Sequence, residues 1–168
     1  MRRGLIALVL LPVYWGLQVV LFDDTFALSS YFQAHLYLAF FLFLPLGLPL
    51  WVQYTLALGW SMLYGLHYPV ALGALLIGTT TLLALRSLWV RLVTPSTDFA
   101  DDGHMAFGTK PLSWCAAYSL PLILLYEILF QGLSNLSLAW PVWQRVLGTS
   151  AYTSLWVFAV FILFYRKR

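Results

Sequence analysis

The chain has few charged residues and a single cysteine, and both scarcities narrow its class. Asp, Glu, Lys and Arg together make up 9% of the 168 residues, against about 25% in ordinary soluble proteins. Cys115 has no second cysteine to pair with, which excludes an intrachain disulfide and a metal site built from several cysteines. So few charges are untypical of a surface that faces water.

Apolar residues in long blocks take the place of the missing charges, and they account for 62% of the sequence. A soluble protein spaces its apolar residues so that one face of each element is buried, whereas these blocks are apolar on all faces. A transmembrane helix needs about 20 mostly apolar residues. The sequence therefore predicts an integral membrane protein with little room for a water-soluble domain.

Six apolar blocks are separated by acidic residues or by Gly and Pro, which end helices. We predict an all-α fold, a single transmembrane domain over residues 1–168 that forms a six-helix bundle. The predicted spans lie at about residues 4–22, 32–46, 50–66, 70–93, 112–133 and 146–165. The second and third are short, so they could form a hairpin that does not fully cross. Arg2 and Arg3 resemble the start of a signal peptide, but no small-residue cleavage site follows, and we expect the first helix to be retained.

The basic residues fall almost entirely on one side of this topology. With six spans both termini lie on the same side of the membrane, and every basic residue except Arg145 lies there or at that end of its helix. These residues are Arg2, Arg3, Arg86, Arg91, Lys110, Arg166, Lys167 and Arg168. Because Lys and Arg are enriched in cytoplasmic loops, we expect both termini to be cytoplasmic.

Four charged residues lie within or beside the apolar blocks and are candidate contact residues. Arg86 lies about two turns before the cytoplasmic end of the fourth span, where it either reaches the headgroups or pairs with another helix. Arg91 is expected to be an interfacial anchor. Glu127 is the one acidic residue inside a predicted span. It is either hydrated near the outer interface or part of a buried polar contact, for which Arg145 is the best-placed partner in the chain.

Small residues mark the third and fourth spans as packing surfaces. Gly59, Gly73 and Gly78 lie on these helices, and small residues let membrane helices approach closely. We therefore expect packing within the chain or docking of a partner helix at these positions.

The sequence carries no catalytic, cofactor or metal-site template. Its histidines are scattered, with no HExxH spacing and no glycine-rich phosphate loop; they are His35, His67 and His104. The tryptophans fall mostly near span ends, which is typical of an aromatic belt at the membrane interface and not of a platform for nucleic-acid bases. We expect no enzyme activity, no cofactor and no nucleic-acid binding.

Several segments, in order along the chain, carry a resemblance to a known family. They are Leu17–Phe22, Leu36–Pro45, Pro49–Trp51, the spaced set Arg86, Arg91 and Pro95, the aromatic-rich Gly108–Tyr118, and the set Arg145, Ser150 and Thr153. In order and spacing they resemble MreD, the small membrane subunit of the bacterial cell-elongation machinery, in its compact six-span branch. Many members have an Asp after the glycine of helix three, where this chain has Ser61–Leu63, and a His early in helix four, where it has Ala71–Leu75. Many also have a His pair in helix five in place of Tyr126–Glu127.

The resemblance implies a non-enzymatic scaffold in the bacterial cytoplasmic (inner) membrane. The implied partners are MreC, a single-span protein with a large periplasmic part, RodA with its class B penicillin-binding protein, and MreB filaments at the cytoplasmic face. The family's fold is similar to the six-helix substrate-binding subunits of energy-coupling-factor vitamin transporters. Such a transporter subunit is the alternative function. It would need a polar pocket open to the outer side, where this chain has few polar residues.

Overall fold

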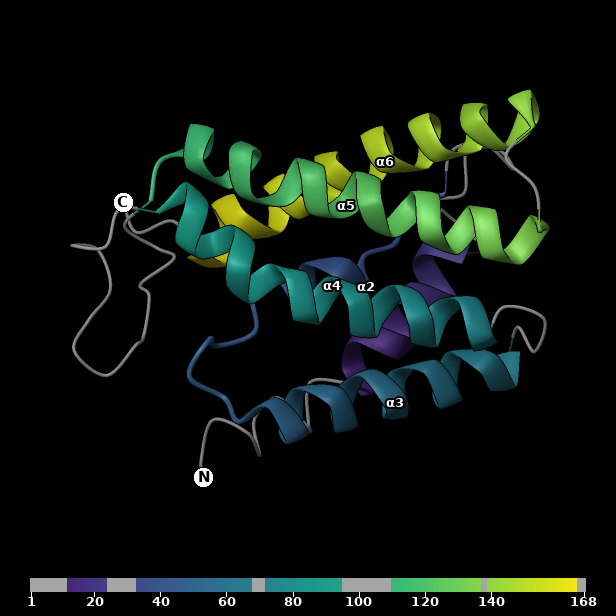
Figure 1. Ribbon diagram of the computed structural model, residues 1–168, viewed down its shortest axis with the longest axis horizontal. Coiled ribbons are helices and arrows are strands. Elements are labelled where there is room, and N and C mark those ends of the chain that lie inside the picture. Colours follow the sequence, from purple (N-terminus) through teal and green to yellow (C-terminus); the bar gives the residue numbers. More distant parts are fainter. Residues whose placement is uncertain (1–11, 24–32, 68–71, 95–109, 137–138, 166–168) are drawn as a thin grey trace.

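The structure, a computed structural model, describes residues 12–23, 33–67, 72–94, 110–136 and 139–165. Within these ranges every regular element is a helix (Figure 1). The long helices are α3 (Leu50–His67), α4 (Leu72–Val93), α5 (Leu112–Asn135) and α6 (Trp140–Val160). The shorter elements are α2 (Tyr37–Leu42) and two π-helical stretches, η1 (Gln18–Asp23), which continues a helix over 12–17, and η5 (Phe161–Tyr165), which continues α6.

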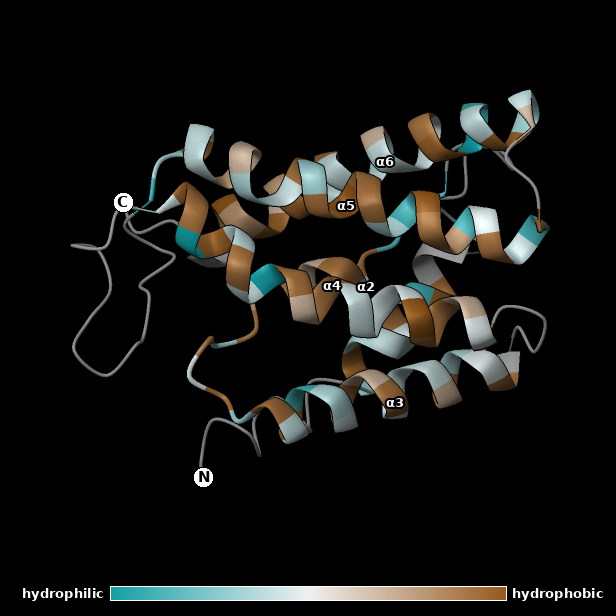
Figure 2. Ribbon diagram, viewed as in Figure 1, coloured by the Kyte–Doolittle hydropathy of each residue, from teal (hydrophilic) through white to brown (hydrophobic). Residues whose placement is uncertain are grey.

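The long helices pack as neighbours in chain order. Figure 1 shows α3, α4 and α5 side by side, with α6 against α5. The short helix α2 packs against both α4 and α6. Figure 2 shows brown, apolar residues recurring between paler ones on each long helix, with few deep-teal, strongly hydrophilic positions. This distribution fits a protein whose outer surface faces lipid.

Three helices in the described part of the chain are long and apolar enough to cross a membrane: Leu72–Val93, Leu112–Asn135 and Trp140–Leu163. The chain is therefore a multi-pass membrane protein by the length and composition of its helices. The predicted count of six spans is not confirmed. The α3 helix has 18 residues but includes polar and amphipathic ones such as Gln53 and Tyr54, and residues 4–11 of the first predicted span lie outside the described residues.

The second predicted span, residues 32–46, does not form a span-length helix in the structure. Helix α2 occupies only Tyr37–Leu42, and the chain around it is irregular. At about 1.5 Å per residue, six residues rise about 9 Å, far less than the roughly 30 Å hydrocarbon core. The short α2 agrees with the alternative left open above, that this segment does not fully cross. An apolar run of this length is also compatible with a segment buried inside protein, and every residue of α2 is buried.

Helix α6 begins earlier than predicted. The sequence predicts a span from about residue 146, whereas the helix starts at Trp140, with Pro141 in its first turn. Proline is favourable there because the first N–H groups of a helix have no partner within the helix. Leu136, at the C-cap of α5, is left-handed with φ of 49°.

Helix α5 contains a proline in its interior, and a neighbouring helix replaces the hydrogen bond that this proline removes. Pro121 has no N–H to donate to the carbonyl of Ala117, four residues earlier. The indole Nε1–H of Trp89, on α4, donates to that carbonyl over 3.1 Å. Membrane helices tolerate proline when neighbouring groups satisfy the freed carbonyl in this way.

Candidate functional site

Residues 33–44, which we call the central segment, run through the core of the protein. From Ala34 to Leu44 every side chain is buried. Only part of this stretch is helical, so many of its backbone groups cannot bond within a helix. Non-helical backbone at membrane depth is tolerated only where protein or water satisfies it. The question for each end of the segment is which side chains do so.

At the N-terminal end, two other elements hold the backbone. Gln18, from η1, donates from Nε2 to the carbonyl of Ala34 (2.8 Å) and accepts the N–H of Leu36 at Oε1 (2.7 Å). The N–H of His35 donates to Thr153 Oγ1 on α6 over 3.0 Å. One amide and one hydroxyl therefore satisfy three consecutive positions of the chain before α2 begins.

At the C-terminal end, a buried arginine and a tyrosine bind backbone carbonyls in the last turn of α2 and just after it. Arg86, on α4, is 1% exposed and donates to the carbonyls of Phe41 and Leu44, the latter over 2.6 Å. Tyr118, on α5, donates from its hydroxyl to the carbonyl of Leu42 over 2.7 Å. Of the two roles considered for Arg86, contact with another helix is confirmed, since its side chain does not reach the surface.

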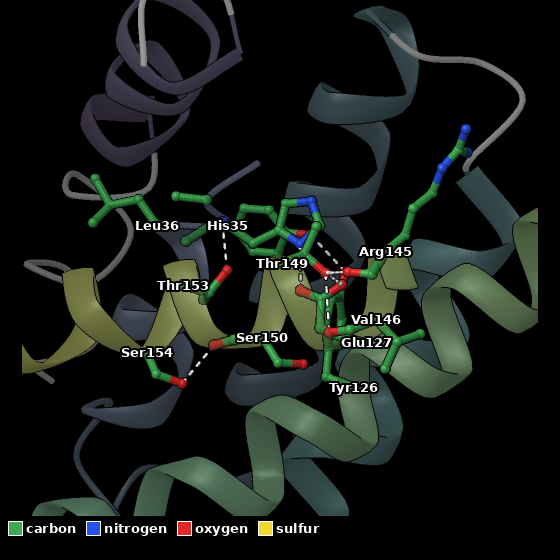
Figure 3. A network of polar contacts seen from close by, with 12 residues as sticks. His35, Leu36, Tyr126, Glu127, Arg145, Val146, Thr149, Ser150, Thr153 and Ser154 are labelled. Carbon is green, nitrogen blue, oxygen red and sulfur yellow. Dashed lines mark hydrogen bonds and ion pairs between the residues drawn. The ribbon is translucent and has the colours of Figure 1, made fainter. Parts of the chain in front are cut away.

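A buried acid–imidazole pair lies beside the N-terminal end of the central segment (Figure 3). Glu127 Oε1 lies 2.6 Å from His35 Nδ1, and the two side chains are 0% and 3% exposed. Thr149, on α6, donates its hydroxyl to Glu127 Oε2 over 3.1 Å. Each carboxylate oxygen therefore has a partner, which is the usual condition for an acidic group inside a membrane protein.

The predicted partner of Glu127 was wrong. In Figure 3 the Arg145 side chain extends away from the carboxylate, while His35 lies directly over it. What Arg145 contributes is its backbone carbonyl, which accepts a second hydrogen bond from the Thr149 hydroxyl over 2.6 Å. The alternative in which Glu127 is hydrated at the outer interface is also wrong, since its side chain is fully buried.

Aromatic side chains enclose this polar pair. The hydroxyls of Tyr37 and Tyr126 lie 2.6 Å apart, and the Tyr126 ring stacks on Phe130. The His35 ring meets Tyr126 and Phe130 edge to face. The ring of Trp60 lies 4.7 Å from that of Tyr37, centroid to centroid. Rings of this kind exclude water while offering hydroxyl groups to the network.

The three predicted packing glycines have different surroundings. A Cβ on Gly78 would lie 2.8 Å from the Tyr126 ring, so this glycine permits the close contact of α4 with α5 inside the fold. A Cβ on Gly59 or Gly73 would meet nothing within 4 Å, so these two are open toward the surroundings. The structure therefore divides the set into an internal packing position and two outward ones. Arg91 is exposed in the last turn of α4, where an interfacial anchor is expected.

Sequence reasoning missed the group that matters most, His35. It was counted among scattered histidines because its acid lies 92 positions away along the chain. One signal was present: His35 lies inside the apolar run 32–46 that was predicted to span, and an ionisable residue at such a place needs a partner. Gln18, Tyr118 and Thr153 lie in the segments that carry the resemblance, but nothing in the sequence indicated that they bind the backbone of residues 34–44.

The chemical capacity of this site is hydrogen bonding and charge compensation inside a closed core. Among the described residues no group of three or more His, Cys, Asp or Glu side chains could hold a metal ion. No family model, curated protein or solved structure matches the chain. The resemblance to MreD therefore stays a prediction from the sequence.

Proposed function

We propose that this chain is a MreD-like, non-enzymatic scaffold subunit of the bacterial cell-elongation complex in the cytoplasmic membrane. In this role it binds MreC and supports RodA and its class B penicillin-binding protein, with both of its own termini facing the cytoplasm and MreB. The proposal rests on the resemblance described above and on one spatial observation.

That observation is where the resembling segments meet. These segments lie far apart in the sequence. In the structure Gln18, Arg86, Tyr118 and Thr153, one from each of four such segments, all hydrogen-bond the backbone of residues 34–44. Their convergence supports a shared fold core and, through it, the family's role.

The state of the buried polar groups favours a scaffold over the transporter alternative. A substrate-binding subunit needs polar side chains that can turn to a ligand. Here both oxygens of Glu127 bind groups of the same chain, His35 and Thr149. Polar groups engaged in this way stabilise a structure and leave association to the outer helix faces.

Helices α3 and α4 offer such outer faces. Large apolar side chains are exposed along them, including Leu58 and Met62 on α3 and Ile77 and Leu88 on α4. Beside these, the open positions at Gly59 and Gly73 would let a partner helix approach closely. We propose that the single helix of MreC docks here.

Affinity purification in mild detergent tests the function. The tagged chain is recovered from its own host, and the co-purifying proteins are identified by mass spectrometry, with an unrelated tagged multi-pass protein as control. Recovery of MreC and RodA only with this chain supports the scaffold. Specific recovery of an ATPase module in their place supports the transporter, and recovery of neither set contradicts the proposal.

A further inference from the structure

We infer that the core holds a buried water site between α3 and the hydroxyl pair of Tyr37 and Tyr126. The bound water accepts one hydrogen bond from the indole N–H of Trp60 and one from the hydroxyl pair. This inference concerns the interior of the chain, goes beyond the scaffold role and does not depend on it.

The indole of Trp60, on α3, is a buried donor that needs an acceptor. Its side chain is 0% exposed, and its Nε1 has no hydrogen-bond partner among the residues that the structure describes. The indoles of Trp89 and Trp114, by contrast, donate to the Ala117 carbonyl and the Thr94 hydroxyl. A buried Trp N–H usually finds a partner, because a buried donor left unmet keeps the full cost of losing its water. The acceptor for Trp60 therefore has to come from outside these residues.

The hydroxyls of Tyr37 and Tyr126 leave a second donor to be accepted. The two oxygens lie 2.6 Å apart, and either hydroxyl can donate to the other. Each carries one proton, so their contact uses one proton and leaves one. Both side chains are buried, and within the described ranges this contact is the one hydrogen bond that either hydroxyl makes. The remaining proton therefore has to be accepted inside the core.

Packing brings the two donors to the same part of the core. The Tyr37 ring lies 4.7 Å from the ring of Trp60 and 6.1 Å from that of Tyr126, centroid to centroid. Tyr37 belongs to α2, Trp60 to α3 and Tyr126 to α5. An acceptor placed between these side chains therefore joins three elements of the fold.

A third polar group without a partner lies on the same turn of α3. The Ser61 side chain is 1% exposed, and its hydroxyl has no hydrogen-bond partner in the described part of the chain. A buried Ser on a helix commonly bonds the carbonyl four residues back, as Ser119 does on α5, and Ser61 does not. A hydroxyl can both donate and accept. Ser61 therefore offers an acceptor for one of the water's own protons.

The chemistry of these groups selects water over a larger or charged ligand. The indole and the hydroxyls are all neutral, so an anion would bring a buried charge that they do not balance. The Trp60 ring also contacts the rings of Phe41 and Tyr64, so a larger ligand would have to displace core side chains. A buried water needs two to four polar partners, which Trp60, the tyrosine pair and Ser61 can supply.

The water gives α3 a polar link to the rest of the bundle. Figure 1 shows α3 at the edge of the bundle, beside α4 and on the far side of α4 from α5. A water bound to Trp60 and to the hydroxyl pair connects this outer helix to α2 and α5.

A crystal structure of the purified chain, at a resolution that shows ordered waters, tests the site directly. We expect density for one water at about 2.7–3.2 Å from Trp60 Nε1 and within hydrogen-bond distance of the Tyr37 or Tyr126 hydroxyl. A protein group or a lipid oxygen bonded to Trp60 Nε1 would overturn the inference. So would the lack of density there in a map that shows ordered waters elsewhere on the chain.

An isosteric change at position 60 gives an independent readout. Trp60 is replaced by the benzothiophene analogue of tryptophan, in which sulfur takes the place of the indole N–H. If water accepts from this N–H, the change breaks a hydrogen bond, and the thermal midpoint should fall by about 2–4 °C. If the N–H has no partner, its removal relieves the cost of burying it, so an equal or raised midpoint would overturn the inference.

The same replacement at Trp114 is the matched control. Trp114 is also buried, and its N–H has a protein acceptor, Thr94 Oγ1, at 3.0 Å. Its thermal midpoint should fall by a similar amount, which calibrates the loss of one indole hydrogen bond. Because both experiments use the chain alone, failure here leaves the scaffold proposal standing.

Discussion

Replacing Glu127 by Leu removes the one buried carboxylate among the described residues and so tests the polar pair most severely. The leucine loses two contacts, one to His35 Nδ1 and one to Thr149 Oγ1. Polar contacts between membrane helices average about 0.6 kcal/mol and reach about 1.7. Two such contacts, taken between the average and the upper value, give an expected loss of about 2 kcal/mol. For a chain of this size that corresponds to a drop of about 4–8 °C in the thermal midpoint.

Glu127→Gln separates the shape of the side chain from its charge. The amide oxygen can still accept from His35 Nδ1–H, and the amide nitrogen can donate to Thr149 Oγ1, whose own proton can remain on the Arg145 carbonyl. We expect a loss below about 1 kcal/mol, since the contacts survive without charge assistance. The order of midpoints should therefore be wild type, then Gln, then Leu.

The assay is thermal unfolding of the purified chain in one detergent, followed by near-ultraviolet circular dichroism. Leu120→Ala is the control, because Leu120 lies on the same helix and its side chain is exposed, so its midpoint should stay close to that of the wild type. A midpoint for Glu127→Leu equal to or above the wild-type value would refute the reasoning. It would mean that the pair contributes nothing that apolar packing does not replace.

Three further predictions concern other parts of the structure. Trp89→Phe should lower the free energy of unfolding by about 1 kcal/mol, because it leaves the Ala117 carbonyl unbonded. In a Pro121→Ala background residue 121 has its own N–H for that carbonyl, so the same change should cost little. Equal costs in both backgrounds would contradict this. Gly78→Leu should lower the thermal midpoint of the chain itself, because the new side chain would collide with the Tyr126 ring. Gly73→Leu should leave the thermal midpoint unchanged and reduce the recovery of MreC. Unchanged recovery would remove that face of α4 from consideration. A reporter active only in the periplasm, fused after Arg168, should be silent, and strong activity would contradict cytoplasmic termini.

The fold could be predicted from the sequence where a long apolar run alone determines a helix. Helices α3, α4 and α5 were expected within a few residues of where they lie, because long apolar runs between Gly, Pro and polar residues leave few other structures open. Helix α2 and the start of α6 were missed for different reasons. A buried segment inside protein is as apolar as a span, and Pro141 breaks or begins a helix depending on its position in the turn.

The candidate site was predicted only in part because its partners are set by packing. Glu127 and Arg86 stand out in the sequence as charges inside apolar runs, and both have buried polar partners in the structure. The partners of these two charges could not be predicted from the sequence. His35 lies 92 residues from Glu127, and Arg86 binds backbone carbonyls, which every residue carries. Spacing along the chain holds no information on such contacts until the helices are placed.

The central segment lies inside the bundle against α5, and a photo-crosslink in native membranes tests this placement most directly. Tyr37 is replaced by p-azidophenylalanine, which puts the reactive azide where the Tyr37 hydroxyl lies 2.6 Å from that of Tyr126. After irradiation and digestion, the account predicts an intramolecular crosslink between the peptide that holds residue 37 and the α5 peptide that holds Tyr126. Crosslinks to lipid, or to peptides outside the bundle core, with none to α5, would contradict it.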